Sequence, residues 1–546
     1  MNRILVLILF CIGTFSLQAQ TFSVSGSVDE ADTGMPLPGV NIILKNTSNG
    51  VVTDFDGNYT INNVSAGDIL VFSYVGFLPQ EITVEEDQTE INATLQTDSE
   101  ALDEVVVIGY GTQQRKDITG AVSVVSNETI EELNPIKIEQ ALQGTAAGVN
   151  VTPSSGAPGA GINVNIRGIA SNSENGPLIL IDGYQGDLNT INPNDIESIS
   201  ILKDAQAAIY GIAGANGVVL VTTKSGKKNT APTIQYDAYV GMQETTRKLP
   251  LLNATEYGLL LNESYANNGQ DLPYPDVSEL GRGTNFQDEV FDTSPIMSHN
   301  LTLNGGSEKV TYSFGASHLD QEGIIGAEKS DFQRSTARFN IGVDISDEFT
   351  FTANSIYTSL NRRSINENGL GSVLFNALNI PPTFARDQED LQGRLGNEII
   401  NPLAQVENTF NDYNLNKFNG SFSLDYTPIE ALTFTSRIGY SLTNSKGKDF
   451  APIIDYGPGK VFNNVRSTVN QNRINDNSYT YDLFGTYENT FNETHHLTGT
   501  AGMTVIRNWG DGLYATGYDV PNNSWDFADI SLTTGTNDGL NNSAYN

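Results

Sequence analysis

Residue types that usually perform catalysis or bind metals are scarce in this sequence and lie far apart. The 546 residues include only four histidines and a single cysteine. No zinc site of the Cys/His type and no assisted nucleophile can be assembled from their spacing. The pair Asp54 and Asp56 before Gly57 offers two carboxylates, but the further oxygen ligands of an EF-hand loop are missing at their fixed offsets. We expect a tight hairpin turn there, no metal or cofactor, and no enzymatic activity.

The stretch DEVVVIGYG, which begins at Asp103, offers binding chemistry instead of catalysis. Its three valines favour an extended backbone, and the two glycines let the chain swivel behind them. An extended segment with unpaired backbone groups can add a strand to a second protein. Taken alone, the stretch also fits a last strand of the unit before it. The candidate binding residues are Asp103, Glu104, Val105, Val106, Val107, Ile108 and Gly109.

The first twenty residues predict an exported protein. One positive charge, Arg3, precedes an apolar run from Ile4 to Leu17 that is too short to span a bilayer. We interpret residues 1–20 as a cleaved secretory signal peptide. Because Cys11 lies within it, the mature chain has no cysteine, and its stability must come from packing and strand pairing.

The composition restricts the class of protein and its partners. With 29 basic and 64 acidic residues the net charge is −35, which argues against a nucleic-acid partner. After residue 20 no apolar run approaches the roughly 18 residues of a membrane helix. The 52 glycines and the frequent aromatic residues leave two classes, a secreted β protein or an outer-membrane β-barrel.

Residues 21–98 predict a small all-β unit. Short alternating runs, such as Phe22–Val28 and Asn41–Lys45, are separated by turn-rich stretches. The sequence VVTDFDGNYTINNVSAGDILVFSYVGFLPQEI closely resembles the carboxypeptidase regulatory-like domain. That resemblance implies a transthyretin-like β-sandwich.

Residues 117–228 alternate short β runs with helix-like pieces, which predicts an α+β unit. The expected strands include Ile162–Ile166, Leu178–Ile181 and Val218–Thr222, and Asp195–Ser198 is one of the expected helical pieces. Residues 99–116 form the linker between this unit and the β-sandwich.

Two long stretches of this unit carry a family resemblance, INVNIRGIASNSENGPLILIDGY and INPNDIESISILKDAQAAIYGIAGANGVVLVTTKSG. They closely resemble the plug domain of SusC/RagA-type TonB-linked outer-membrane transporters. The sequence ALDEVVVIGYGTQQRKDITGAV resembles the segment before the plug in that family. That family usually has Val-Pro where Tyr184-Gln185 stand here, and commonly an Arg in the region of Ile212-Ala213. We therefore expect a locally altered plug loop. The matching plug residues are Arg167, Gly168, Asp182, Gly183, Lys203, Asp204, Tyr210, Gly211, Asn216 and Gly217.

Residues 229–546 predict the first part of a large transmembrane β-barrel. Phe418, Phe422 and Leu424 alternate with Asn419 and Ser421, and such alternation over ten or more residues is typical of a tilted strand between lipid and water. Short turns alternate with long loops, which predicts roughly nine strands with their tight turns on the periplasmic side. Plugged transporters have about 22 strands. We interpret the final NNSAYN as an outer loop and expect the chain to be the N-terminal part of a longer protein.

The resemblance implies TonB-dependent import of oligosaccharides or peptides across the cell outer membrane. Residues 103–109 would be the TonB box, bound by the C-terminal domain of TonB, which an inner-membrane motor drives. Residues 21–228 would lie in the periplasm or inside the barrel. A SusD-like surface lipoprotein would cover the outer face, and outer-membrane lipid would surround the wall.

Individual residues receive narrower expectations. Arg167, in an otherwise apolar strand, is the candidate for a buried ionic contact that locks the plug, with a surface arginine as the alternative. Asp182, Lys203 and Asp204 are expected to hold the plug fold together. Aromatic residues of the expected loops could stack on sugar rings, although barrel rims are aromatic for other reasons. These are Tyr265, Tyr274, Tyr456, Trp509, Tyr514 and Trp525.

Three other interpretations remain open at this stage. A TonB-linked receptor that signals to a sigma-factor regulator would normally carry a signalling domain at its N-terminus, where the regulatory-like sandwich lies here. A truncated, non-functional fragment would retain the same plug signature. A surface adhesin would have repeated short strands and no plug signature.

Overall fold

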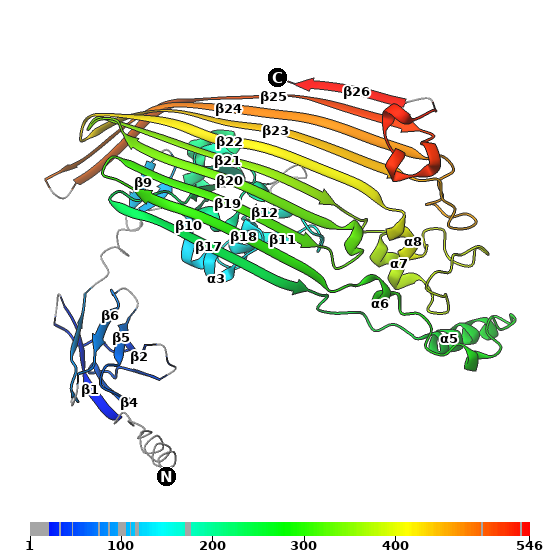
Figure 1. Ribbon diagram of the computed structural model, residues 1–546, viewed down its shortest axis with the longest axis horizontal. Coiled ribbons are helices and arrows are strands. Elements are labelled where there is room, and N and C mark those ends of the chain that lie inside the picture. The colour runs from blue at the N-terminus through cyan, green and yellow to red at the C-terminus, as the bar shows by residue number, and fades with distance from the viewer. Residues whose placement is uncertain are drawn as a thin grey trace, which may run out of the picture. The chain divides into compact units, whose positions relative to one another are not determined.

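The chain divides into two units in the computed structural model, and each unit is described by itself. The structure describes residues 21–545, apart from 32–33, 46, 48, 75–76, 86–87, 97–104, 110, 115–119, 170–175, 493–494 and 536–537. The expected signal peptide, Asp103 and Glu104 lie outside the described residues. Figure 1 shows the elements and their labels.

Two small β-sheets form the first unit. Their strands run in the orders β4-β1-β7 and β3-β2-β5-β6. Alternating residues of both sheets, such as Val24, Ile42, Ile61 and Phe72, are fully buried and pack into one apolar core. The unit is therefore the β-sandwich that the sequence predicts. Its strands are β1 (Phe22–Glu30), β2 (Asn41–Leu44), β3 (Gly50–Val52), β4 (Asn58–Val64), β5 (Ile69–Ser73), β6 (Gln80–Thr83) and β7 (Ala93–Leu95).

The turn at Asp54–Gly57 is tight, but it is not a hairpin turn. It joins β3 to β4, and these strands belong to different sheets. The Asp54 carboxylate accepts hydrogen bonds from the backbone N–H groups of Asp56 (3.0 Å) and Asn58 (2.8 Å), so it serves the turn itself. No group of three or more His, Cys, Asp or Glu side chains that could hold a metal ion occurs among the described residues.

A five-stranded sheet with helices forms the plug, which belongs to the second unit. The strand order is β10-β15-β16-β13-β14, and β11 and β12 form a separate hairpin. The strands are β10 (Val122–Ser126), β11 (Val149–Pro153), β12 (Ile162–Ile166), β13 (Leu178–Ile181), β14 (Tyr184–Gln185), β15 (Ile196–Leu202) and β16 (Val218–Thr223). The helices are α3 (Asn127–Leu133) and α4 (Ile138–Leu142), with 3-10 turns η2 (Leu188–Thr190), η3 (Pro193–Asp195) and η4 (Asp204–Gly214).

The expected helical piece Asp195–Ser198 is wrong. Asp195 ends the 3-10 turn η3, and the chain enters β15 at Ile196. Ile196, Ile199 and Ile201 are fully buried in the plug core, and β-branched residues favour the extended state there. Pairing on both sides, with β10 and β16, overrides the local helical signal.

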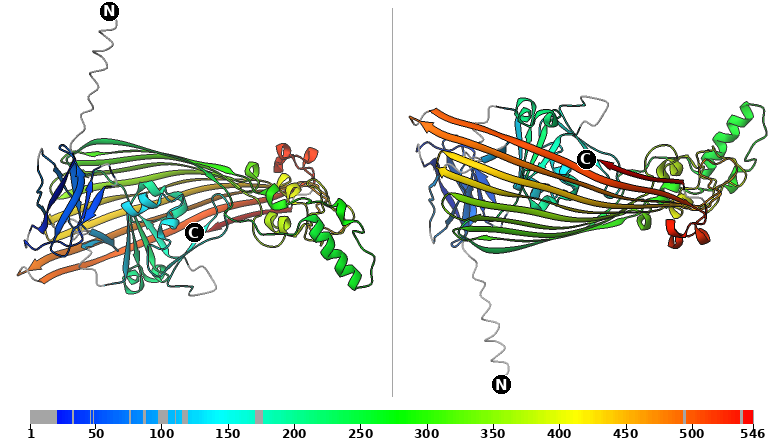
Figure 2. Two further views of the ribbon diagram at one scale, coloured as in Figure 1. Left: turned by 90° about the horizontal axis from the view of Figure 1, so that it is seen from below. Right: turned by 90° about the horizontal axis from the view of Figure 1, so that it is seen from above.

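Ten antiparallel strands follow the plug, and each pairs with the next one in the sequence. The plug lies against the concave face of this curved sheet, as Figure 2 shows. The strands are β17 (Thr230–Gln243), β18 (Ser294–Gly306), β19 (Val310–Glu322), β20 (Asp331–Asp344), β21 (Phe349–Arg363), β22 (Phe410–Ile429), β23 (Leu432–Ala451), β24 (Thr468–Phe491), β25 (His495–Tyr518) and β26 (Asp538–Tyr545).

The tenth strand corrects the interpretation of NNSAYN as a loop. Leu513 of β25 pairs with Asn542 in this segment. The residues Asn541, Asn542 and Ser543 carry no apolar alternation, so the pairing with β25 decides their conformation. The short turns and long loops alternate along the sheet as predicted, with tight turns such as that between β18 and β19 at one end.

Short helices occupy the long loops at the other end of the sheet (Figure 1). They are α5 (Ala254–Asn267), α6 (Phe286–Val290), α7 (Val373–Asn379) and α8 (Pro402–Glu407). Five 3-10 turns accompany them, η5 (Val277–Glu279), η6 (Ala327–Lys329), η7 (Pro521–Asn523), η8 (Trp525–Phe527) and η9 (Ile530–Leu532). In the part of the chain that the structure describes, no helix has the length and apolar character needed to cross a bilayer.

The sheet is apolar on its convex face and polar on the face that holds the plug. On β22, Phe418 and Phe422 are each 42% exposed, whereas Asn419 and Ser421 between them are 1% and 3% exposed. This is the reverse of a strand in a water-soluble protein, where the apolar side is buried. It is the arrangement of a barrel wall with lipid outside and a polar interior.

Candidate functional site

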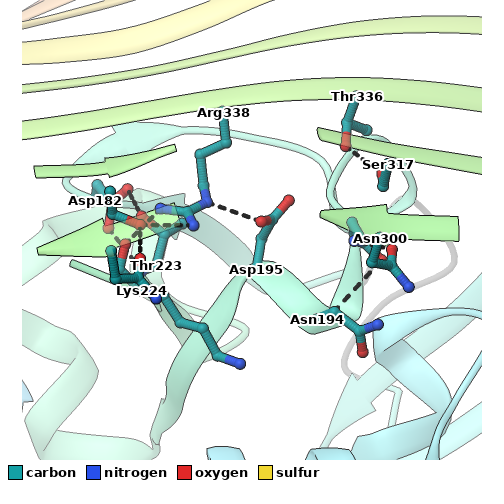
Figure 3. Close-up of polar contacts among 12 residues, drawn as sticks. Asp182, Asn194, Asp195, Thr223, Lys224, Asn300, Ser317, Thr336 and Arg338 are labelled. Atoms are coloured by element: carbon teal, nitrogen blue, oxygen red, sulfur yellow. Dashed lines mark hydrogen bonds and ion pairs between the residues drawn. The ribbon is translucent and has the colours of Figure 1, made fainter. Parts of the chain in front are cut away.

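A buried arginine of the wall, Arg338, binds the plug through an ion pair and a hydrogen bond. Arg338 on β20 donates from Nε to Asp195 Oδ1 of the plug at 2.9 Å and from Nη2 to Ser313 Oγ on β19 at 2.9 Å. Its Nη1 also donates to the backbone carbonyl of Lys224, directly after the last plug strand. We call these four residues, Arg338, Asp195, Ser313 and Lys224, the plug clamp, and Figure 3 shows Arg338, Asp195 and Lys224.

Local sequence explains why the two charged groups meet. Arg338 lies on the inward face of β20, which alternates with the lipid side, so its side chain must point at the plug. Asp195 ends the turn η3, which begins with Asn192 as its cap and Pro193 in its first position. The side chains of Arg338 and Asp195 are 1% and 4% exposed, so water hardly screens the charge of either one.

Burial makes this ion pair sensitive to the loss of either partner. The second carboxylate oxygen of Asp195 has no hydrogen-bond partner among the described residues. Removing one member of a buried pair leaves an uncompensated charge, which typically destabilises by about 3–5 kcal/mol. The pair therefore determines the position of the plug against the wall, and its net contribution to the free energy of unfolding is smaller than the cost of breaking it.

Further hydrogen bonds join the same plug region, residues 182–195, to the wall. Asn192 donates to Asn300 at 2.7 Å, and Thr358 donates to the carbonyl of Thr190 at 2.6 Å. The carbonyl of Asn189 accepts from Arg334 Nη1 at 3.2 Å, and the carbonyl of Asp182 accepts from Ser421 Oγ at 3.2 Å. The contacts reach strands β18, β20, β21 and β22, so this plug segment is held along a broad arc.

Tyr184, the first of the sequence departures, is part of this interface. It is 2% exposed, and its burial raises the pKa of the phenol well above its ordinary value. Its hydroxyl has no hydrogen-bond partner within the described residues. Gly439 of β23 lies directly against it: a Cβ at Gly439 would come within 2.8 Å of the Tyr184 Cβ. A small residue in the wall thus admits a large one from the plug.

Arg167 does not make the buried ionic contact that we expected. It follows the end of β12, has a left-handed backbone (φ 58°), and forms an ion pair with Asp204 in which the side chains are 54% and 50% exposed. Because the strand has already ended, the side chain does not enter the wall interface. The buried contact is instead made between Arg338 and Asp195.

Asp182 and Lys203, two of the other predicted plug residues, make side-chain hydrogen bonds within the plug. Asp182 accepts hydrogen bonds from the Thr223 backbone N–H (3.0 Å) and hydroxyl (2.7 Å), and loss of water around it raises the pKa of its carboxyl. Lys203 donates to Ser123 Oγ at 2.7 Å, and burial lowers the pKa of its amine.

The motif glycines and their neighbours make close turns. Gly217 has φ +88°, and a Cβ there would meet Ile166 at 2.6 Å, so only glycine fits. Tyr210 packs against the small cluster around Leu202 and Val218. Gly168, Gly183 and Gly211 also have positive φ, and Asn216 precedes Gly217.

The candidate TonB box is a strand in this structure. Val105–Ile108 form β8, which pairs with β9 (Gly111–Gln114) in a sheet of two strands. Gly109 has φ +60°, and a Cβ on it would lie 3.2 Å from Ile209 Cδ1 of the plug. Within the described residues one edge of β8 is thus paired and the other edge has no strand beside it.

The expected aromatic loop residues are mostly engaged elsewhere. Trp509 and Tyr514 lie within strand β25, because the strand is much longer than the alternation suggested. Trp525 stacks on Phe410 at 5.9 Å between ring centroids, and Tyr456 is only 6% exposed. Tyr274 shares a hydrogen bond with Thr383 (3.0 Å), and Tyr265 on α5 is 38% exposed.

Sequence reasoning missed the residues of the plug clamp. Asp195 lies inside a stretch that the resemblance covers, but nothing in its neighbours marks it as the acidic partner. The available signal was Arg338, a cation at an inward position of an alternating strand, which demands an anionic partner in the interior. The sequence alone does not show which acidic residue of the plug lies opposite Arg338, so it could not identify Asp195 as the partner.

Comparison with known proteins agrees with this architecture. Residues 114–218 match the TonB-dependent receptor plug domain, and residues 24–107 match the CarboxypepD_reg-like domain. The chain is 35% identical over 537 residues to TonB-dependent receptor P26 of Formosa agariphila, which covers 96% of this chain and 52% of that protein. It is 33% identical over 446 residues to TonB-dependent receptor SusC of Bacteroides thetaiotaomicron, covering 75% of this chain and 43% of SusC.

A solved structure has the same fold. The RagAB peptide importer in its open-open state superposes with a TM-score of 0.69 and 26% identity over 81% of this chain and 53% of that chain. The chain spans about half the length of the curated relatives it matches.

The fold defines a class of architecture, a plug domain held against the polar face of a β-barrel-type wall. More particularly, the chain has the fold of a TonB-dependent receptor, carries the plug domain of these receptors, and has SusC among its homologues. Its relatives are receptors and transporters, not enzymes. TonB-dependent receptors of this kind are outer-membrane β-barrels.

Proposed function

We propose that the complete protein imports nutrients across the outer membrane with work delivered by TonB. The observation that carries this proposal is the plug clamp, which holds a folded domain inside a wall with a lipid-type exterior. A plug held in this way has to be moved before a nutrient can pass. The outer membrane has neither ATP nor an ion gradient of its own, whereas one charge crossing 100 mV at the inner membrane yields about 2.3 kcal/mol.

Residues 103–109 are proposed to receive this work as the TonB box. The edge of β8 that is not paired with β9 offers backbone groups to an added strand, which is the recognition mode of β-augmentation. Force on this segment travels along the chain through β9 to β10, the first strand of the plug sheet. Within the described residues β10 is an edge strand of the plug sheet that pairs with β15 alone, so we expect it to separate from that sheet most easily.

The similar proteins support a proposal for the partners and the cargo. We propose a SusD-like surface lipoprotein as the lid and an oligosaccharide or a peptide as the transported nutrient. The peptide alternative is supported by the solved relative, which is described as a peptide importer. The β-sandwich and plug, residues 21–228, are placed in the periplasm or within the barrel, and export is assigned to residues 1–20.

Uptake and binding measurements on the complete protein test this proposal. Deletion of Val105–Val107 should abolish energised uptake and leave binding of nutrient at the outer face unchanged. Val106→Pro should do the same because it removes a backbone donor and bends the strand. Val106→Thr is the matched control, because it keeps a β-branched side chain and the donor. Normal growth of the deletion strain on the transported nutrient alone would reject the TonB-box assignment.

A further inference from the structure

A groove of about 540 Å³ lies on the convex face of the sheet, away from the plug. Its floor is made by Ala316 and Ala337, which pair directly across β19 and β20. Ser317 and Thr336, their neighbours in sequence, hydrogen-bond to each other on the opposite, plug-facing side, as Figure 3 shows. The groove therefore opens toward the surface that faces lipid.

Large apolar side chains form the walls of the groove. In the same row across the strands, Leu301 flanks the alanines on one side and Tyr357 on the other. The next row ends the groove with Phe314 and Phe339, whose ring centroids lie 5.0 Å apart. Leu301, Phe314 and Tyr357 are 47%, 42% and 45% exposed, so their apolar faces are uncovered. Two small residues among large ones leave a slot with almost no polar atoms.

Two histidines lie next to the groove, one row nearer to the long loops. His299 and His318 are direct cross-strand partners on β18 and β19. Only four histidines occur in the whole chain, so half of them meet at this point. His299 Nδ1 shares a hydrogen bond with the Tyr236 hydroxyl (2.8 Å), and His318 Nδ1 shares one with Ser335 Oγ (2.9 Å).

These hydrogen bonds determine what the histidines can offer. When the hydroxyls donate to Nδ1, the ring proton is on Nε2, which becomes a donor. The Nε2 atoms of His299 and His318 donate no hydrogen bond to another described residue. Two outward donors beside an apolar slot match an amphiphile with an anionic head and a hydrocarbon tail.

We propose that this groove binds one lipid of the outer leaflet, with an acyl chain along Ala316 and Ala337 and its phosphate at His299 and His318. Continuity with the lipid-facing belt selects this occupant, because acyl chains already surround the groove wherever the wall lies in a bilayer. The assignment to the outer leaflet rests on the proposed placement, in which the long loops face outward. It does not require that TonB drives transport.

Native mass spectrometry of the complete protein in detergent tests this site. Two probes are added separately: dioleoyl phosphatidic acid, and dioleoylglycerol, which has the same chains without phosphate. The unsubstituted protein should retain one phosphatidic acid in preference to dioleoylglycerol. Ala337→Phe fills the slot and should lower the occupancy of both probes at least tenfold.

The remaining variants separate the tail from the head. His299→Gln with His318→Gln should leave the dioleoylglycerol occupancy unchanged and remove the preference for phosphate. Ala501→Phe is the matched control, because Ala501 is an exposed alanine of β25 in the row of Phe434, outside the groove. It should bind both probes as the unsubstituted protein does. Unheated gel mobility verifies that each barrel is folded.

Equal lipid occupancy in the unsubstituted protein and the Ala337→Phe variant would overturn the proposal. If that variant also lost a dimer, the groove would be assigned to a second copy of the chain. Neither measurement depends on nutrient or TonB, so a failure here is distinct from a failure of the import proposal.

Discussion

Replacing Arg338 by methionine should loosen the plug in its barrel. Methionine keeps much of the side-chain length but removes all three hydrogen bonds of the guanidinium, to Asp195, Ser313 and Lys224. Asp195 would then be a buried carboxylate without its paired guanidinium, since its side chain is 4% exposed. The expected loss is about 3–5 kcal/mol, the typical effect of removing one member of a buried pair.

The loss can be read as a shift in the urea concentration that opens the channel. In planar bilayers that contain the complete protein, conductance should rise when urea unfolds the plug. With a slope of roughly 2 kcal/mol per molar urea for a domain of this size, the midpoint should fall by about 1.5–2.5 M. Arg473→Met is the matched control, because Arg473 is an exposed arginine on β24 in the row of Lys446 and Asn414, away from the plug.

A double variant tests the physical reasoning itself. Arg338→Met with Asp195→Leu removes both charges, and replacing a buried pair by apolar groups is often neutral or stabilising. The double variant should therefore be more stable than Arg338→Met alone, and the two changes should not add. A midpoint for Arg338→Met within about 0.5 M of the unsubstituted protein would refute the clamp, and so would simple additivity.

Two further predictions concern other contacts. Gly439→Ala should displace Tyr184, because the added Cβ would lie 2.8 Å from the Tyr184 Cβ, and it should raise the resting conductance of the channel. Adding Tyr184→Ala in the same chain should restore the low conductance. An unchanged conductance in the Gly439→Ala variant would contradict the packing argument. Burial raises the pKa of Tyr59 in the β-sandwich from 10.0 to about 12, and its hydroxyl donates to the carbonyl of Ile91 at 2.8 Å. Folding favours the protonated form of Tyr59, so this tyrosine stabilises the folded sandwich fully below pH 10. That contribution to the free energy of unfolding should be lost as the pH rises from 10 to 12. Thermal unfolding of the complete protein should show that loss in the sandwich transition, and Tyr59→Phe should remove the pH dependence of this step.

The local sequence pattern was sufficient to predict the bounds of a strand where turn residues flank that strand on both sides. The expected strands Ile162–Ile166 and Leu178–Ile181 have the same bounds as β12 and β13. The alternation of Phe418 and Phe422 with Asn419 and Ser421 predicted a wall with unlike faces, because side chains on a strand alternate by geometry alone. The class of fold followed from these periods and from the resemblance of the plug.

Only the tertiary structure decided which side chains meet across the interior. Arg167 and Arg338 are both isolated cations in strand-like sequence, yet one ends in solvent beside Asp204 and the other is buried against Asp195. Strand ends and register separate the two cases, and both depend on pairing between distant segments. The same reason explains Ile196 in a strand instead of a helix, and NNSAYN in β26 instead of a loop.

The groove beside His299 and His318 is a second case in which the sequence does not show which side chains lie together. The sequence determines that these histidines and the two alanines are on strands with one outward face. It does not determine that three strands bring these four residues into adjacent rows, because that requires the register of β18, β19 and β20. Alternation is a property of one strand, whereas a site is a property of several strands held side by side.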